Sequence, residues 1–84
     1  MSDITTIEQD IRGWISEQLA MLLERDAADL DPDKPLEDMD VISLDVVHVI
    51  AGAMRQFSIK VPRNAFEGHN TINKLAGLMA SHAD

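Results

Sequence analysis

The sequence predicts an all-α protein, a four-helix bundle with three main helices, one short helix and a long loop between the first and second helices. Apolar residues recur every three or four positions in three segments, which is the spacing of one face of a helix. No segment is a convincing strand candidate. With 84 residues, of which 45% are hydrophobic, we expect one free-standing domain that covers residues 1–84.

The first helix is expected at residues 6 to 25. Thr5 and Glu8 have the spacing of a capping box, in which a hydroxyl and a carboxylate pair with free amides at a helix start. Apolar side chains then repeat with a period near 3.6, at Ile7, Ile11, Trp14, Ile15, Leu19 and Leu22. This pattern predicts a helix with one buried face.

A long loop is expected at residues 26 to 40. Its first eleven residues, 26–36, contain two prolines and four aspartates, which disfavour a helix and favour turns. Leu30, Leu36 and Met39 are spaced as apolar anchors. We therefore expect this loop to lie on the surface of the bundle, held by these three side chains.

The second helix is expected between residues 43 and 57. Its predicted apolar face consists of Leu44, Val47, Ile50, Met54 and Phe57. Four β-branched residues and Gly52 are mediocre helix formers, so tertiary burial must hold this segment helical. The solvent side is expected to contain Val46, His48, Arg55 and Gln56.

The remaining elements are expected to be short. Pro62 favours an extended segment before it, and Gly68 marks the end of a short helix at residues 64 to 67. Thr71 has the right side chain to cap a last helix. The buried face of that helix is expected to be Ile72, Leu75, Ala76 and Met79.

Charge and composition exclude several classes of function. The chain has 15 acidic and 7 basic residues, a net charge of −8, which disfavours nucleic acid and anionic lipid as partners. Twelve of the acids precede Ser43. The absence of cysteine excludes disulfides and thiolate metal sites. No segment is long enough to span a membrane or resembles a signal peptide, so we expect a cytoplasmic monomer.

The sequence predicts neither a catalytic centre nor a metal site. His48, His69 and His82 lie on different elements without metal-ligand spacing, and we expect all three on the surface. The repeat Asp29-x-Asp31-x-Asp33 begins like a calcium-binding loop. Lys34 stands where that loop requires glycine, however, and Asp40 stands where it requires glutamate. We expect a non-catalytic protein, because no nucleophile elbow or phosphate-binding glycine loop occurs either.

Ser43 is the residue whose surroundings point to a function. A serine at a helix start has an ordinary role as a cap. Here, however, the run from Leu36 to Val47 (LEDMDVISLDVV), the exit Phe57-x-Ile59-x-Val61-Pro62 and the pair Thr71-Ile72 together resemble the acyl carrier protein family. In that family a Leu-x-x-Asp-Ser-Leu-(Asp/Glu) signature opens the second helix, and a Phe-x-Ile-x-(Ile/Val)-Pro exit closes it. The resemblance covers essentially the whole chain.

The resemblance implies that Ser43 carries a 4′-phosphopantetheine arm, which a phosphopantetheinyl transferase attaches from coenzyme A. Acyl groups would be held on the arm as thioesters and presented to acyl-loading enzymes, ketosynthases or other acyl-processing enzymes. The positions implied at partner interfaces are Leu44, Asp45, Val47, Ala51 and Arg55. The positions implied around a sequestered acyl chain are Ile50, Met54, Ile59, Phe66 and Leu75. The same spacing is equally consistent with Val47 and these five residues being ordinary residues of the hydrophobic core.

Two departures from the family pattern leave alternatives open. Ile42 replaces the aspartate that usually precedes the modified serine, and Asp40 would be the cap if the helix began earlier. The second helix also lacks the glutamates typical of fatty acid carriers, which favours a specialised polyketide or similar secondary-metabolite pathway over general fatty acid synthesis. The alternatives are an unmodified carrier-like scaffold or a peptidyl or aryl carrier protein.

Overall fold

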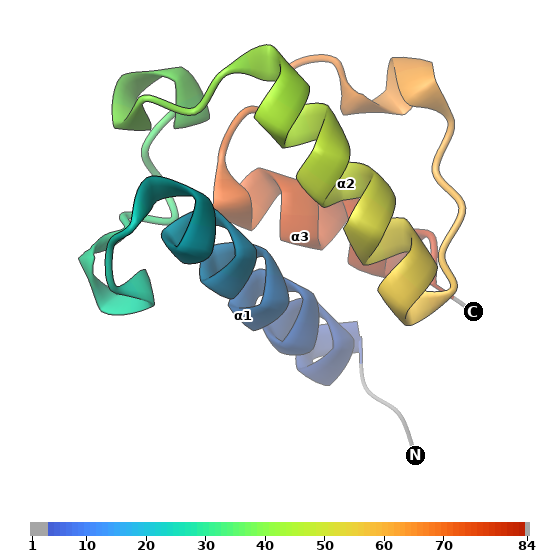
Figure 1. The fold of residues 1–84 in the computed structure, drawn as a ribbon. Helices are drawn as coiled ribbons and strands as arrows, with labels where there is room; N and C mark the ends of the chain where they lie inside the picture. Colours follow the sequence, from blue (N-terminus) through green and yellow to red (C-terminus); the bar gives the residue numbers. More distant parts are fainter. Residues whose placement is uncertain (1–3, 84) are drawn as a thin grey trace.

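The computed structural model describes residues 4–83 and is built from helices (Figure 1). The α-helices are α1 (Ile4–Leu23), α2 (Ser43–Phe57) and α3 (Ile72–Ser81). The 3-10 helices are η1 (Ala27–Asp29), η2 (Leu36–Met39) and η3 (Arg63–Phe66). Because every regular element among residues 4–83 is helical, the predicted all-α class is confirmed, and the expected short third helix is the 3-10 helix η3.

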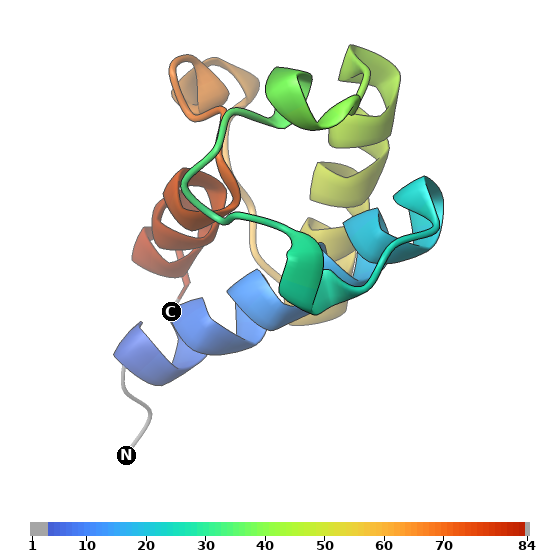
Figure 2. The same ribbon diagram turned by 90° about the vertical axis from the view of Figure 1, so that its left-hand side faces the viewer.

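The three α-helices surround a shared core. α1 packs most extensively against α3 and less extensively against α2, and η3 lies beside α3. The segment between α1 and α2 runs across one end of these helices (Figure 2). It is tied to the start of α3, because Leu36 N–H donates to the Asn70 carbonyl at 2.8 Å and Asn73 N–H donates to the Pro32 carbonyl at 3.0 Å. The loop therefore has a fixed position beside Ser43.

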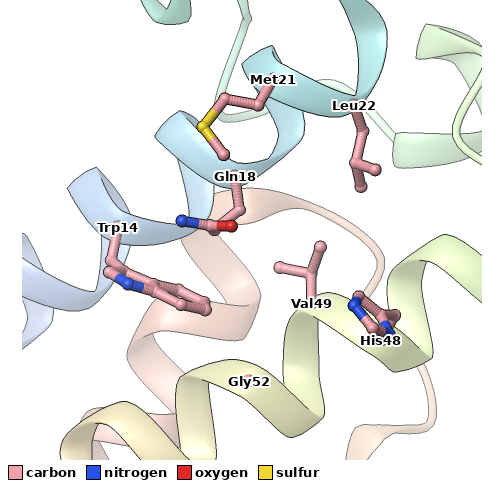
Figure 3. Close-up of a pocket in the computed structure, with 7 residues that line it drawn as sticks. All are labelled: Trp14, Gln18, Met21, Leu22, His48, Val49 and Gly52. Atoms are coloured by element: carbon pink, nitrogen blue, oxygen red, sulfur yellow. The ribbon is translucent and has the colours of Figure 1, made fainter.

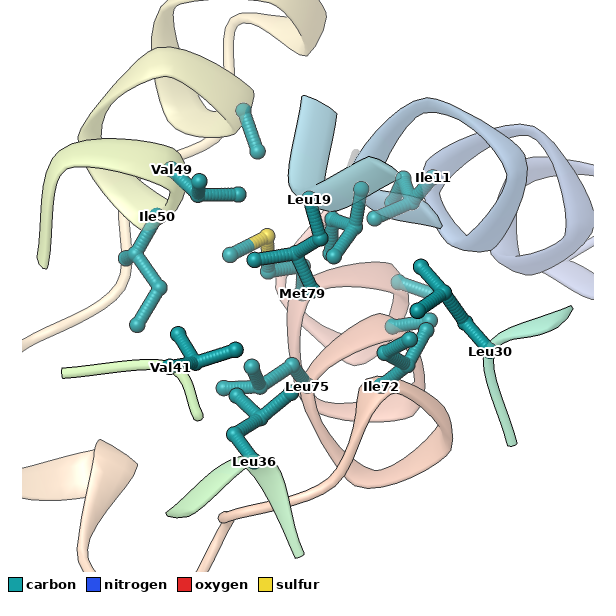
Figure 4. Packing of buried hydrophobic residues seen from close by; sticks show 14 of the residues in the cluster. Ile11, Leu19, Leu30, Leu36, Val41, Val49, Ile50, Ile72, Leu75 and Met79 are labelled. Carbon is teal, nitrogen blue, oxygen red and sulfur yellow. The ribbon is translucent and has the colours of Figure 1, made fainter. Parts of the chain in front are cut away.

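The core draws side chains from all three α-helices and from the long loop (Figure 4). The most deeply buried large side chains are Ile11, Ile15, Leu19, Ile72, Leu75 and Met79. Leu30, Leu36 and Met39 are buried beside them, which confirms the predicted loop anchors. The predicted buried face of the last helix is also confirmed, since all four of its residues are buried.

α2 buries only part of the predicted face, because Ile50 is buried and Met54 and Phe57 pack against the core. Val49, Ile50 and Ala53 are buried, whereas Leu44 is 72% exposed and Val47 is 55% exposed. The prediction that Leu44 and Val47 belong to the buried face is therefore wrong. Val46, expected on the solvent side, packs against the core. Apolar residues occupy almost every position from 44 to 51, so two overlapping stripes satisfy the helical period and only packing against α1 decides between them.

The ends of the helices show which predicted caps form. α1 begins at Ile4, so Thr5 lies inside the helix and the prediction that it caps α1 is wrong. α1 ends at Leu23, two residues earlier than expected, and Glu24 follows with a left-handed φ of 54°. Thr71 caps α3 as predicted, because its Oγ1 accepts a hydrogen bond from Lys74 N–H at 3.0 Å.

Neither a spanning helix nor a cluster of metal ligands is found in the part of the chain that the structure describes. Among residues 4–83, no helix is both long and apolar enough to cross a membrane. The same residues contain no group of three histidine or carboxylate side chains placed to hold a metal ion. His48 and His82 are exposed and His69 is half-buried.

Candidate functional site

Ser43 is the first residue of α2 and its side chain is exposed. Ile42 before it has an extended backbone, with φ −82° and ψ 160°. The first hydrogen bond of the helix runs from Val46 N–H to the Ile42 carbonyl at 3.1 Å. The N–H groups at the start of a helix have no partner within it and lie at the positive end of its dipole. The Ser43 hydroxyl is therefore presented to solvent beside free amide donors.

The residue that precedes Ser43 leaves α2 without a side-chain cap. Ile42 occupies the N-cap position, and an isoleucine side chain cannot accept a hydrogen bond. The possibility that Asp40 takes over as the cap is wrong, because α2 does not begin earlier than Ser43. Asp40 instead ends η2 with a left-handed φ of 64°, and its carboxylate lies 3.8 Å from the Arg25 guanidinium.

We expect Ile42→Asp to stabilise the protein relative to Ile42→Ala by about 1 kcal/mol, because a carboxylate at the N-cap accepts a free N–H and faces the positive end of the helix. Both variants remove the same exposed isoleucine side chain, so the difference between them isolates the cap. Urea denaturation measures it. Equal free energies of unfolding for the two variants would contradict this view of the α2 start.

A small depression adjoins Ser43. Its volume is about 190 Å³. It is lined by Leu36, Glu37, Val41, Ser43, Val46, His69 and Asn70. His69 Nδ1 lies 3.0 Å from the Glu67 carbonyl oxygen, and because a carbonyl only accepts, this ring nitrogen carries the proton. Sequence reasoning missed the nearness of His69 to Ser43, since 26 residues separate them and only the folded loop brings them together.

A second and more apolar pocket lies between α2 and η3, with a volume of about 320 Å³. Its lining residues are Val47, Ile50, Ala51, Met54, Val61, Arg63 and Phe66. Three residues expected around an acyl chain, Ile50, Met54 and Phe66, line this pocket. The other two do not: Ile59 is buried beside neighbouring hollows, and Leu75 is a core residue at 1% exposure. We call this hollow the α2–η3 pocket.

A third hollow lies between α1 and α2 (Figure 3), with a volume of about 300 Å³. It is lined by Trp14, Gln18, Met21, Leu22, His48, Val49 and Gly52. Gly52 lets the two helices approach, because a Cβ atom there would lie 2.9 Å from Trp14 Cη2. His48, Val49 and Gly52 follow Ser43 by five, six and nine residues, which places them on the opposite side of α2 from Ser43.

Most of the residues expected to contact partners form one exposed stripe on α2. Leu44, Val47, Ala51 and Arg55 are all exposed, and their spacing of three or four residues places them on one side of the helix. Ser43 lies four residues before Val47, at the edge of this stripe. Asp45 is half-buried and belongs to another side of α2. The structure thus brings four of the five predicted residues together.

Comparison with protein families identifies the family to which the chain belongs. No curated protein matches the chain. A family model described as "Phosphopantetheine attachment site" matches residues 13–79, most of the chain and nearly all of the three-helix core. Members of this family are carrier proteins that hold 4′-phosphopantetheine covalently. The match covers Ser43, the stripe on α2 and the α2–η3 pocket, and the chain belongs to the phosphopantetheine-attachment family of carrier proteins.

Proposed function

We propose that Ser43 is the attachment residue and that the chain is an acyl carrier protein. The observation that supports this most directly is the exposed Ser43 hydroxyl on the first residue of α2, at a helix start without a side-chain cap. The resemblance around Ser43 supports the same residue. The arm supplies a thiol, on which acyl groups are carried as thioesters, so the protein needs no cysteine of its own.

The surroundings of Ser43 fit a phosphodiester. The amides of the first turn of α2 supply hydrogen-bond donors, and the helix dipole favours an anion there. The adjacent depression also contains Asn70, whose side-chain amide can donate a further hydrogen bond to an anionic group. Glu37 is the acidic residue on its wall. The residues of this chain therefore hold the phosphodiester and position it beside the exposed stripe.

Attachment needs a partner enzyme, a phosphopantetheinyl transferase. In the reaction, Ser43 Oγ forms a bond to the phosphorus that carries the pantetheine, and the pyrophosphate bond of coenzyme A breaks. Adenosine 3′,5′-bisphosphate leaves with the bonding electrons, and a base of the transferase takes the serine proton. The carrier contributes the accessible hydroxyl and an N-terminal helix environment that stabilises the product anion.

The composition of α2 favours a specialised acyl carrier over a general fatty acid carrier. Asp45 is its one acidic residue, and Arg55 lies on the exposed stripe. A partner surface for this helix must offer apolar contacts to Leu44 and Val47 and needs few basic groups, because α2 has little negative charge. We propose ketosynthases and acyl-loading enzymes of a polyketide or similar pathway as partners, with weak and reversible docking.

The attachment is tested by incubating the apo protein with coenzyme A, magnesium and a promiscuous phosphopantetheinyl transferase. We expect a single phosphopantetheine increment in the intact mass, located by fragmentation on the peptide that contains Ser43. No increment, or an increment on another residue, contradicts the proposal and favours the unmodified scaffold. Loading by an acyltransferase rather than by an amino-acid-activating enzyme then separates an acyl carrier from a peptidyl carrier.

A further inference from the structure

The segment from Val46 to Phe66 is positively charged on an otherwise acidic protein. It contains no aspartate or glutamate, although the chain has 15 of them. Arg55, Lys60 and Arg63, three of the seven lysines and arginines, lie in this segment and are all exposed. Within residues 4–83, the two ion pairs involve cations outside the segment. The structure therefore gathers cations that no described carboxylate neutralises.

These cations border two neighbouring apolar hollows. The α2–η3 pocket has six apolar lining residues and one charged residue, Arg63. A shallower hollow of about 540 Å³ shares Met54 and Val61 with it and has Arg55 and Lys60 on its wall. All three cations thus lie beside apolar surface on the same part of the molecule. Arg63, the first residue of η3, is the cation that lines the α2–η3 pocket.

Ser43 lies on the same side of α2 as three residues that line the α2–η3 pocket. Val47, Ile50 and Met54 follow Ser43 by four, seven and eleven residues, so all four lie on one side of α2. The helical rise places Val47 about 6 Å and Met54 about 16 Å along the axis from Ser43. A group tethered to Ser43 therefore reaches the α2–η3 pocket along the side of α2 on which Ser43 lies. The hollow between α1 and α2 (Figure 3) lies on the opposite side of α2.

The backbone of Arg63 is fixed beside this pocket by the turn that contains it. Pro62 precedes it with φ −59°, and Ala65 N–H donates to the Pro62 carbonyl at 3.0 Å, which closes the first turn of η3. A guanidinium on a fixed backbone is suited to a carboxylate, because its planar N–H groups pair with two oxygens at once. The floor formed by Ile50, Met54 and Phe66 is suited to methylene groups.

Building on the proposed attachment at Ser43, we propose that the α2–η3 pocket selects acyl groups that end in a carboxylate, with Arg63 as the counter-ion. The apolar floor contacts the methylene chain, and Arg63 at the opening pairs with the distal carboxylate. The cargo class is therefore a dicarboxylic acid bound through one carboxyl group as the thioester. Arg63 acts here as a specificity residue for cargo and takes no part in attachment.

The test compares two acyl groups of the same shape. Apo protein is loaded by a promiscuous transferase from glutaryl-coenzyme A or from 5-methylhexanoyl-coenzyme A, in which an isopropyl group replaces the carboxylate. The rate of thioester cleavage by hydroxylamine on the protein is divided by the rate for the same thioester on free pantetheine. Amide chemical shifts of Met54 and Phe66 give a second readout that does not depend on cleavage.

We expect Arg63→Gln to speed relative cleavage of the glutaryl thioester by about two- to fivefold, the range that an exposed ion pair supports. The 5-methylhexanoyl thioester should be unaffected, and molar salt should remove the difference. Arg25→Gln is the matched control, since it removes an exposed guanidinium outside the pocket. The Met54 and Phe66 shifts that glutaryl loading produces should shrink in Arg63→Gln alone.

Equal relative cleavage in wild type and Arg63→Gln, or an equal effect on both acyl groups, would overturn the proposal and assign the cations to an acidic partner surface. This outcome can be distinguished from a failure of the proposed attachment at Ser43. If Ser43 is not the attachment residue, neither acyl group is added there, and fragmentation of the loaded protein shows this before any cleavage rates are compared. Normal loading without discrimination contradicts the cargo class alone.

Discussion

We expect that replacing Ser43 with alanine will abolish phosphopantetheine incorporation and leave the fold intact. No hydrogen bond of the Ser43 hydroxyl is found among the described residues, and the side chain is exposed, so its loss leaves no buried polar partner. Alanine is also the better helix former. We therefore expect complete loss of the mass increment, together with unchanged helical circular dichroism and a free energy of unfolding within about 0.5 kcal/mol of wild type.

The matched control for this prediction is Ser81→Ala. Ser81 is also exposed and helical, but it ends α3 and its hydroxyl donates to the Leu78 carbonyl at 2.6 Å. This variant should accept the increment as wild type does. Incorporation by Ser43→Ala, at any site, would show that the transferase uses another residue. Loss of helicity in Ser43→Ala would show that the serine has a structural role that its exposure does not indicate.

Leu75→Ala is expected to reduce stability strongly. Leu75 is 1% exposed in the core between α3, α2 and the long loop (Figure 4). Truncating a buried leucine removes its packing and leaves a cavity, at a cost of about 2–5 kcal/mol. Domains of this size have total stabilities of about 5–15 kcal/mol, so the variant should unfold at a much lower urea concentration.

The control for Leu75→Ala is the same substitution on the exposed stripe. Leu44 is 72% exposed, so Leu44→Ala should change the free energy of unfolding by less than about 0.5 kcal/mol. The pair tests which face of α2 is buried. A cost for Leu44→Ala similar to that of Leu75→Ala would mean that Leu44 packs in the core, as its spacing alone suggested.

The sequence predicted the helices well where a single apolar stripe was available. In α3, Ile72, Leu75, Ala76 and Met79 are the predicted face, and all are buried. In α2, valines and isoleucine occupy neighbouring positions, so the helical period alone could not separate the stripe that contains Val47 from the stripe that contains Val49. The 3-10 helices η1 and η2 were missed because such short turns depend on the path of the loop more than on apolar spacing.

The candidate site was predictable only in its local part. The position of Ser43 at a helix start follows from the residues around it, and the structure places it there. The proximity of His69 to Ser43, and of Arg63 to Met54, depends on how residues 58–70 return across α2. Hydrogen bonds between distant segments, such as Leu36 N–H to the Asn70 carbonyl, determine that path, and no local pattern encodes them.

The close approach of Trp14 to Gly52 gives the chain an intrinsic fluorescent probe at the contact between α1 and α2. Trp14 is the one tryptophan in the sequence, and its ring meets Phe57 edge to face with centroids 6.3 Å apart. Gly52 and Phe57 belong to α2, whereas Trp14 belongs to α1. Indole emission therefore follows the spacing between the helix that carries Ser43 and the helix behind it. Any movement of α2 during loading or unloading can be recorded in real time without attaching a dye.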